Sequence, residues 1–412
     1  MNTKTNPVVR GVRLHPLMML IFIILIFSPI TIQATDINPG PIIIGLDADL
    51  SGASSQSGQS IRRGALIAID EINAGGGVLG RPLVLETRDH HGNPARAKDN
   101  MAELADLPDL VAVLGGLHTP VALQVLPLVH EQRIPFLIPW AAGTPVVRNG
   151  YDPNFVFRVS VCDADAGPFL VDAALARGYK RLGLLLENTG WGRSNQAGMT
   201  KAAADRNLPA PTVQWFNWGV RDFSLQLAAF RAKGVDVILL VANPPEGLLL
   251  VQTLAALPAP ERLPVISHWG ITGGTFAEQA GAALNAVNLC FLQTFNFNTP
   301  PFPDRAAALF AAYRRLFPEV AGPLDIPAVS GLAHACDLVH LLAKAITAAG
   351  STDRTAVRNA LEKLASHAGI MAEYAPPFTP SRDDALGPEV FQLGRYNESG
   401  QVVPMIKKKE MP

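Results

Sequence analysis

The sequence predicts an α/β protein of two doubly wound lobes, each a parallel sheet with helices on both faces. Short apolar runs alternate with amphipathic helical patterns twice along the chain, over residues 41–140 and again over residues 163–269. Strands followed by helices at this spacing are typical of parallel sheets covered on both faces. The length of 412 residues leaves room for two such lobes.

The first series of elements starts at the first apolar run after the N-terminal region. Its expected strands are residues 41–50, 81–89, 111–115 and 134–140, and its expected helices are residues 61–77, 93–107 and 119–132. The polar run at residues 51–60 is typical of a loop. Where the third strand turns into its helix, Thr119 is expected as N-cap and Pro120 as the first helical residue.

The second series repeats the alternation. Its expected strands are residues 181–188, 211–218, 236–243 and 263–269, and its expected helices are residues 166–179, 194–207, 224–234 and 246–257. The chain then becomes mainly helical, with expected helices at residues 304–317, 330–350 and 353–366 and strand-like pieces at 389–397 and 401–406. Because such crossovers are right-handed, each half should form a doubly wound lobe.

The N-terminal segment has the pattern of a secretory signal peptide. Three basic residues precede an apolar run from Leu17 to Phe27, and the first acidic residue is Asp36. A small-residue cleavage site ends at Ala34, so residues 1–34 are expected to be removed. The alternative is an uncleaved anchor, although the apolar run is short for a membrane-spanning helix.

Charge and cysteine content exclude several classes of partner and site. The formal net charge is −1, and loss of the basic N-terminal segment makes the mature chain more acidic. That balance gives no reason to expect a nucleic-acid partner. Cys162, Cys290 and Cys336 are widely spaced, lack metal-ligand spacing and allow at most one disulfide. All three are expected as small buried residues.

No motif in the chain predicts catalysis, a metal or a cofactor. Gly75 to Gly80 satisfies GxGxxG, but a helical pattern precedes it and a strand follows, which reverses the order that a dinucleotide site requires. These glycines are expected to end a helix and form a turn. His118 and His268 have no evident nucleophile partner in sequence, so the chain is not expected to be an enzyme.

The loops that follow the expected strands are the best candidates for a ligand site. In open α/β sheets, ligands bind at the carboxyl ends of the strands. These loops are rich in aromatic and small polar residues, and three of the five tryptophans, Trp140, Trp191 and Trp269, lie in them. An indole can bury about 150–250 Å² against a ligand. The alternative is that these rings pack only between the lobes.

Several motifs carry a resemblance to a known family. They include "RRGALIAIDEINAGGGVLGRPL", "VLGGLHTP", "IPFLIPWAAGTP", "DADAGP" and "LLLENTGWG". With them the chain resembles the periplasmic binding proteins of the leucine/isoleucine/valine type, the substrate-binding components of ABC uptake systems. The resemblance implies the type I architecture, two lobes joined by three crossovers. It places lobe 1 at residues 35–160 and 292–370, and lobe 2 at residues 161–291 and 371–412.

The resemblance also implies roles for individual residues. In the amino-acid-binding members, a serine at the place of Thr119 holds the ligand carboxylate together with helix N-terminal N–H groups, and His118 beside it could add a donor. The turn matching "WAAGTP" supplies a carbonyl and a hydroxyl in the family, which makes Ala141, Ala142 and Thr144 candidates. Trp191 falls where the family has an aromatic wall.

Two departures from the family pattern concern the ligand's ammonium group and its aromatic walls. Where the amino-acid binders have an acidic residue, this chain has Trp269, preceded by His268. The family's second aromatic wall aligns with Asn243 or Pro244, and its first-loop tryptophan with Ser57. An unpaired buried ammonium would cost several kcal/mol. A free amino acid is therefore expected only if Asp163 or Glu246 replaces the missing acid.

These observations predict a periplasmic solute-binding protein that delivers its ligand to an ABC permease in the inner membrane. The expected ligand is a small polar or carboxylate-bearing molecule: an amino acid, an amide, or an aromatic or aliphatic acid. Closure of the two lobes around it would bring Trp191 and Trp269 over a ligand docked on Thr119. An extracytoplasmic sensor that signals to a membrane partner is the alternative, and a hydrolase built on His118 or His268 is a third hypothesis.

The candidate ligand-binding residues come from both series of loops. They are Ser57, His118, Thr119, Trp140, Ala141, Ala142, Thr144, Asp163, Trp191, Asn243, His268 and Trp269.

Overall fold

The computed structural model describes residues 1–8, 11 and 40–405, and the chain from Gly40 onward forms one compact unit. The apolar run and the cleavage site of the expected signal peptide lie outside the described residues. Within the described part the architecture is α/β, with two large sheets and helices on both faces of each. The predicted fold class is confirmed.

The first lobe is built on a five-stranded parallel sheet with strand order β2-β1-β3-β4-β5. Its strands are β1 (Ile42–Ala48), β2 (Leu83–Asp89), β3 (Leu110–Gly115), β4 (Phe136–Ile138) and β5 (Val156–Arg158). Its helices include α2 (Ser55–Ala74), α3 (Pro94–Ala105), α4 (Thr119–Glu131) and α5 (Thr144–Val147). Three later helices follow in the chain: α12 (Pro303–Leu316), α13 (Val329–Ala349) and α14 (Arg354–Leu361).

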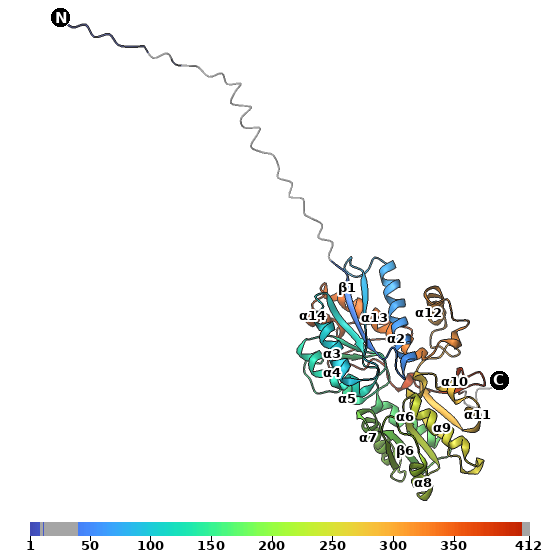
Figure 1. The fold of residues 1–412 in the computed structure, drawn as a ribbon. Coiled ribbons are helices and arrows are strands. Elements are labelled where there is room, and N and C mark those ends of the chain that lie inside the picture. Colours follow the sequence, from blue (N-terminus) through green and yellow to red (C-terminus); the bar gives the residue numbers. More distant parts are fainter. Residues whose placement is uncertain (9–10, 12–39, 406–412) are drawn as a thin grey trace. The chain divides into compact units, whose positions relative to one another are not determined.

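Alternating side chains of this sheet enter two separate cores. Ile42 and Ile44 of β1 belong to the core that contains α2 and α13, which pack along each other (Figure 1). In β3, Ala112 and Leu114 belong to this same core, whereas Val113 between them belongs to the core that contains α3 and α4. Because successive side chains of a strand point to opposite faces, an almost wholly apolar strand supplies both cores at once.

The second lobe is built on a seven-stranded sheet with strand order β14-β13-β10-β9-β8-β6-β7. Its strands are β6 (Leu182–Glu187), β7 (Thr212–Phe216), β8 (Val237–Val241), β9 (Val265–Ser267), β10 (Leu289–Gln293), β13 (Gln392–Tyr396) and β14 (Val402–Pro404). The first five are parallel, whereas β13 and β14 form an antiparallel edge hairpin against β10.

Helices cover both faces of this sheet as well. They are α6 (Asp163–Leu175), α7 (Gly190–Asp205), α8 (Ser224–Ala232), α9 (Pro244–Ala256), α10 (Phe276–Ala280) and α11 (Ala283–Ala286). Leu184 and Leu186 enter the core formed with α6 and α7, while Leu185 enters the core formed with α8 and α9. Short elements complete the chain: η1 (Ala259–Glu261), η2 (Trp269–Gly273), η3 (Pro323–Asp325), β11 (His367–Ala368), β12 (Glu373–Tyr374) and η4 (Pro388–Val390).

Several element boundaries differ from the expectation. Helix α2 begins at Ser55, so half of the polar run expected as a loop is helical. Strand β9 ends at Ser267, because His268 caps the 3₁₀ turn η2. Strands β5, β10, β11 and β12 are additional; α6 follows β5, and α12 follows β10. The residue boundaries of the two lobes stay a prediction.

Two further features of the cores bear on the sequence analysis. Helix α13 is long and apolar enough to cross a membrane by composition alone, but most of it is buried inside the protein, as expected of a core helix. Cys162, Cys290 and Cys336 are free and buried, which confirms the expectation for all three. Burial raises the pKa of each thiol, to about 11 for Cys290.

Candidate functional site

A small cavity, here called the central cavity, lies between the two lobes at the carboxyl ends of β3, β6 and β8. Its volume is ≈ 10 Å³, about the space that one water molecule needs. The lining residues are Leu117, His118, Thr119, Pro120, Trp140, Ala142, Glu187, Trp191, Asn243 and Trp269. The structure thus brings together most of the candidate residues from both series of loops.

Thr119 is the first residue of α4, and His118 is the N-cap with an extended backbone. The expectation that Thr119 caps this helix is therefore wrong by one residue, and no side chain caps it. The first intrahelical bond runs from the Ala122 N–H to the His118 carbonyl. Earlier N–H groups have no acceptor within the helix, and the positive end of the helix dipole lies beside them.

The Thr119 hydroxyl also joins α4 to the next loop. Its oxygen accepts a hydrogen bond from the Gly143 N–H at 3.1 Å, which leaves the hydroxyl proton available to a ligand. A Cβ at Gly143 would lie 2.4 Å from Thr119 Cγ2, so only glycine allows this close approach. The hydroxyl is thereby oriented before any ligand arrives.

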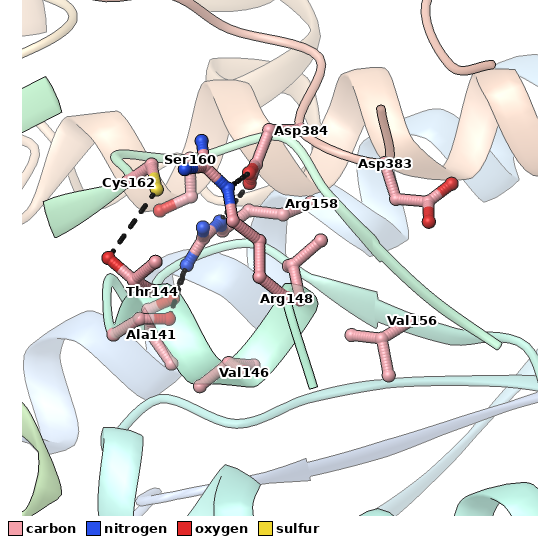
Figure 2. Close-up of polar contacts among 12 residues, drawn as sticks. Ala141, Thr144, Val146, Arg148, Val156, Arg158, Ser160, Cys162, Asp383 and Asp384 are labelled. Atoms are coloured by element: carbon pink, nitrogen blue, oxygen red, sulfur yellow. Dashed lines mark hydrogen bonds and ion pairs between the residues drawn. The ribbon is translucent and has the colours of Figure 1, made fainter. Parts of the chain in front are cut away.

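Arg158, at the end of β5, holds the turn behind the cavity (Figure 2). Its Nη1 donates to the carbonyls of Ala141 and Gly143, each at 3.0 Å, and its Nε donates to Asp384 Oδ1 at 2.6 Å. Burial opposes the charge, but the Asp384 carboxylate keeps the pKa of Arg158 above its usual value. The fully buried guanidinium thus fixes the backbone that presents Ala142 to the cavity.

Ala141 and Thr144 support this turn and do not line the central cavity. The Thr144 N–H donates to the Ser194 hydroxyl of α7 at 3.0 Å, and its own hydroxyl lies 3.9 Å from Cys162 Sγ. The bond to Ser194 joins the turn to the second lobe.

Aromatic rings fill most of the space around the central cavity. Trp140 and Trp269 stack with their ring centroids 4.7 Å apart and their planes 21° from parallel. Trp191 meets the His268 ring edge-on at 5.0 Å. A Cβ at Gly270 would lie 2.5 Å from the Trp191 ring, so a glycine is needed beside this indole. Offset-stacked and edge-on pairs are the favoured aromatic geometries.

Asp163 and His268 lie behind Trp191 and do not line the cavity. Asp163 Oδ1 accepts a hydrogen bond from Trp191 Nε1 at 3.2 Å. When the ring proton of His268 is on Nε2, the same oxygen also accepts from His268 Nε2 at 3.1 Å. Both residues are fully buried. Their arrangement orients the Trp191 indole, whereas Asp163 Oδ2 is buried and has no hydrogen-bond partner among the described residues.

Ser57 also lies away from the central cavity. It is fully buried on α2, where its hydroxyl would touch a Cβ added at Gly273 of η2. The expectation that it sits in a ligand loop depended on that segment being a loop, and the segment is helical.

Glu187 lines the central cavity but was not among the candidates. It is the last residue of β6 and is fully buried. Its carboxylate accepts hydrogen bonds from Trp218 Nε1 and Asn243 Nδ2, both at 2.9 Å, and from the Thr189 hydroxyl. Burial raises its pKa to about 7, against the effect of these donors. The available signal was an acid that ends an otherwise apolar strand.

A second, larger cavity of ≈ 260 Å³ adjoins the first, because His118 and Asn243 line both. Glu246 lines it and accepts a hydrogen bond from the Gly219 N–H at 3.0 Å. Asp49 lies 3.5 Å from His118 Nε2. Burial would raise the pKa of Asp49, but the hydrogen bonds from His118, Ser54 and Gly52 lower it to about 2.

Asp49, Asp89 and His91 form a loop cluster of side chains of the kind that bind metal ions. One potential coordinating atom from each lies within 4.8 Å of the others. The carboxylates serve the turn after β1. Asp49 accepts the N–H groups of Gly52 and Ser54, and Asp89 accepts the Leu50 N–H and the Ser51 hydroxyl. These bonds account for the cluster as loop structure.

Comparison with known families identifies relatives over most of the chain. The family described as "Periplasmic binding protein" matches residues 41–385. The Leu/Ile/Val-binding protein BraC3 of Rhizobium johnstonii is 26% identical over 336 residues, covering 78% of this chain and 83% of the relative.

Solved structures share the fold. The type 1 periplasmic binding protein of Bordetella pertussis has a TM-score of 0.79 at 24% identity, covering 89% of this chain and all of the other. A branched-chain amino acid transporter substrate-binding protein from Streptococcus pneumoniae, in complex with isoleucine, has a TM-score of 0.73 at 20% identity, with coverage of 89% and 100%. These similarities extend over both lobes.

Proposed function

The chain belongs to the periplasmic binding protein family, and from this premise we propose that it captures a small amino acid between its lobes. Its relatives are substrate-binding proteins of the Leu/Ile/Val-binding type. The captured ligand would pass to an ABC permease of the inner membrane. The name of the Rhizobium relative supports this ligand class.

The first lobe offers the chemistry for the ligand's carboxylate. Thr119 has a hydroxyl proton to donate, and the first N–H groups of α4 have no acceptor within the helix. A carboxylate at a helix N-terminus gains about 0.3–1 kcal/mol at the surface and up to about 2 kcal/mol when partly buried. His118 lines the same wall and can add a donor.

The second lobe offers Glu187 for the ligand's ammonium. It is the one carboxylate that lines the central cavity among the described residues. Asp163 lies behind Trp191 and does not line this cavity, and Glu246 belongs to the neighbouring cavity. An ammonium beside Glu187 would lower the pKa of that carboxyl and make it the charged partner.

Binding would proceed by closure of the lobes. The ligand docks on Thr119 in the open form, and Glu187, Trp191 and Trp269 complete its surroundings on closing. A ligand shifts this equilibrium only because it contacts both walls in the closed form. The central cavity holds ≈ 10 Å³, so ligand binding also requires the Trp140 and Trp269 rings to shift apart.

The observation that carries the proposal is a cavity with a helix N-terminus on one wall and a buried carboxylate on the opposite wall. A calorimetric panel of alanine, leucine, acetate and benzoate at pH 6 and pH 8 tests it. We expect the amino acids to bind at both values. Acetate and benzoate should bind more weakly at pH 8, where Glu187 is ionised without a cation beside it.

Two variants test which protein group binds the ligand's carboxylate and which binds its ammonium. Thr119→Ala should weaken every carboxylate-bearing ligand, whereas Glu187→Gln should weaken only the amino acids and leave benzoate independent of pH. Tighter binding of benzoate than of any amino acid at both pH values would contradict the amino-acid proposal. It would leave an acid without an ammonium as the ligand.

A further inference from the structure

A larger cavity on the other side of Trp140, here called the Gln293 compartment, has a volume of ≈ 280 Å³. Gln56 of α2, Trp140 and the start of α13 line it from the first lobe. Gln293 of β10, Thr275 before α10 and Tyr396 of β13 line it from the second. Its volume is close to the smaller ligand pockets of proteins, about 300 Å³. None of the twelve candidate ligand residues lines it except Trp140.

Gln293 is the residue that distinguishes this compartment. Its side chain is only 4% exposed, yet neither Nε2 nor Oε1 has a hydrogen-bond partner among the described residues. A buried polar group left unpaired costs about 1–3 kcal/mol, and most buried polar groups in folded proteins are paired. Both atoms have less than 1 Å² of accessible surface, so the amide can offer its donor and acceptor to a ligand only after the side chain turns toward the cavity.

The Gln293 amide is also held in place by its neighbours. A Cβ at Gly394, on the adjacent strand β13, would lie 2.9 Å from Gln293 Cδ and 3.0 Å from its Nε2. The amide therefore packs directly on the backbone of Gly394, where any larger residue would displace it. The next residue, Thr294, is fixed by a 3.0 Å hydrogen bond with His334 of α13.

The charges around the compartment exclude anions. Its described lining contains the carboxylates of Glu278 and Asp325 and no lysine, arginine or histidine. Asp325 already accepts hydrogen bonds from the Gly322 N–H and from Gln401 Nε2. A carboxylate ligand would find no cation here, whereas a neutral group would leave no charge unpaired.

Flat apolar surfaces complete the compartment. Phe297, Tyr396 and Trp140 line it, together with Phe291 and Phe295, which are themselves fully buried. Planar groups gain from stacking or edge contact with such rings, about 0.5–1.5 kcal/mol per pair beyond the area buried. Ala328, also in the lining, has a left-handed backbone with φ 47°. For a residue other than glycine this conformation costs about 1–3 kcal/mol and is concentrated at ligand sites.

We propose that the Gln293 compartment is a second binding site, for a neutral planar molecule that carries a carboxamide-like edge. Binding moves the Gln293 amide off Gly394 toward the compartment, where the ligand's N–H donates to Oε1 and its carbonyl accepts from Nε2, while its ring lies beside Phe297 and Tyr396. Because both lobes line the compartment, its occupant stabilises the closed form. The inference concerns a site separate from the central cavity and does not rest on the amino-acid proposal.

Three probes of nearly equal shape test this site: benzamide, benzoate and benzamidine, titrated calorimetrically into the purified protein. We expect benzamide to bind and Gln293→Leu to weaken it at least tenfold. The variant should lose no thermal stability, because leucine removes an unpaired amide of similar volume. The same variant should bind leucine as the wild type does, which separates a failure here from a failure of the proposed function.

A second variant guards against misfolding of the first. Gln56→Trp fills the compartment from the half-buried start of α2, where the Gln56 side chain forms no hydrogen bond or ion pair with the other described residues. It should abolish benzamide binding while circular dichroism stays unchanged. Thr119→Ala, in the central cavity, is the matched control and should leave benzamide affinity unaltered.

Three outcomes would overturn the proposal. One is the absence of benzamide binding at millimolar concentration. Another is benzamide affinity that both Gln293→Leu and Gln56→Trp leave unchanged. The third is binding of benzoate or benzamidine that is as tight as benzamide and equally sensitive to Gln293→Leu, because the site would then not select a neutral amide.

Discussion

The central cavity and the Gln293 compartment lie between the same two lobes and share Trp140, yet they treat polar groups in opposite ways. In the central cavity, Thr119 and Glu187 have protein partners and stacked indoles fill the remaining space. In the compartment, space remains and Gln293 has no partner among the described residues.

This contrast separates two kinds of preparation for a ligand. Partners that orient a group without using all of its capacity, as Gly143 does for Thr119, cost nothing while the site is closed and empty. An unpaired buried amide lowers the stability of the protein until something binds it. A group such as Thr119, which has a partner, does not lower the stability of the protein. An unpaired group such as Gln293 does, and this loss of stability indicates a ligand site.

The largest expected effect concerns the support of the central cavity. Arg158→Met would leave Asp384 buried without its partner and the carbonyls of Ala141 and Gly143 without a donor. Breaking a buried pair in this way costs about 3–5 kcal/mol. Chemical denaturation should show that loss. Arg148→Met is the matched control, since Arg148 is 59% exposed and 3.9 Å from Asp384, and it should change stability by less than about 0.5 kcal/mol.

Replacing the polar residue of each cavity by leucine should change the free energy of unfolding in opposite directions. Glu187→Leu would leave the donors of Trp218 and Asn243 unpaired and should lower the free energy of unfolding by about 2–3 kcal/mol. Gln293→Leu removes an amide that has no partner and should raise that free energy by about 1 kcal/mol. Urea unfolding of both variants measures the two changes in the free energy of unfolding. Equal destabilisation would mean that Gln293 is satisfied in solution and would remove the contrast.

Part of the pH dependence of stability should originate in the central cavity. Burial raises the pKa of Glu187 from 4.5 to about 7, so the folded state holds its proton more tightly than the unfolded state does. The resulting stabilisation is complete below the unfolded pKa near 4.5 and is lost as pH rises through about 7. The melting temperature should therefore fall between pH 5 and pH 8, and Glu187→Gln should make that fall smaller.

Asp47 provides a control for that experiment. Burial on β1 raises its pKa to about 7 as well, although it lies outside both cavities. Asp47→Asn should reduce the pH dependence of stability without changing that of ligand binding. If Glu187→Gln leaves both dependences as they were, the titration does not belong to the central cavity.

The smallest expected effect on stability is that of Thr119→Ala. Thr119 begins α4 without capping it, and its hydroxyl accepts one bond from Gly143. Its loss should cost about 1 kcal/mol of stability or less. The affinity for an amino acid should nevertheless fall about tenfold or more. Calorimetry measures the loss of affinity and a thermal melt measures the loss of stability. If the two losses were equal in free energy, the role of Thr119 would be purely structural.

The sequence predicted the fold and one wall of the site because their signals are local. Strand–helix alternation specified both sheets, and the turn before α4 was found from Gly115 to Pro120. The helix start at Ser55 was missed because residues 51–60 are mostly serine and glycine, which favour caps and turns over helix interiors.

What the sequence could not provide were contacts between distant segments. Glu187 at the end of β6 was passed over in favour of Asp163 and Glu246, whose partners become visible only when the loops meet. Gln293 had no local signal at all, because its isolation depends on Gly394, about a hundred residues away in the chain. Burial and missing partners are properties of the assembled lobes.

A crystal structure of the protein with the amino acid that binds most tightly tests the central claim most directly. The account predicts electron density between Thr119 and Glu187, with the carboxylate at the start of α4, the ammonium beside Glu187, and the Trp140 and Trp269 rings moved apart. Density for the amino acid anywhere else, or with its ammonium away from Glu187, would contradict it.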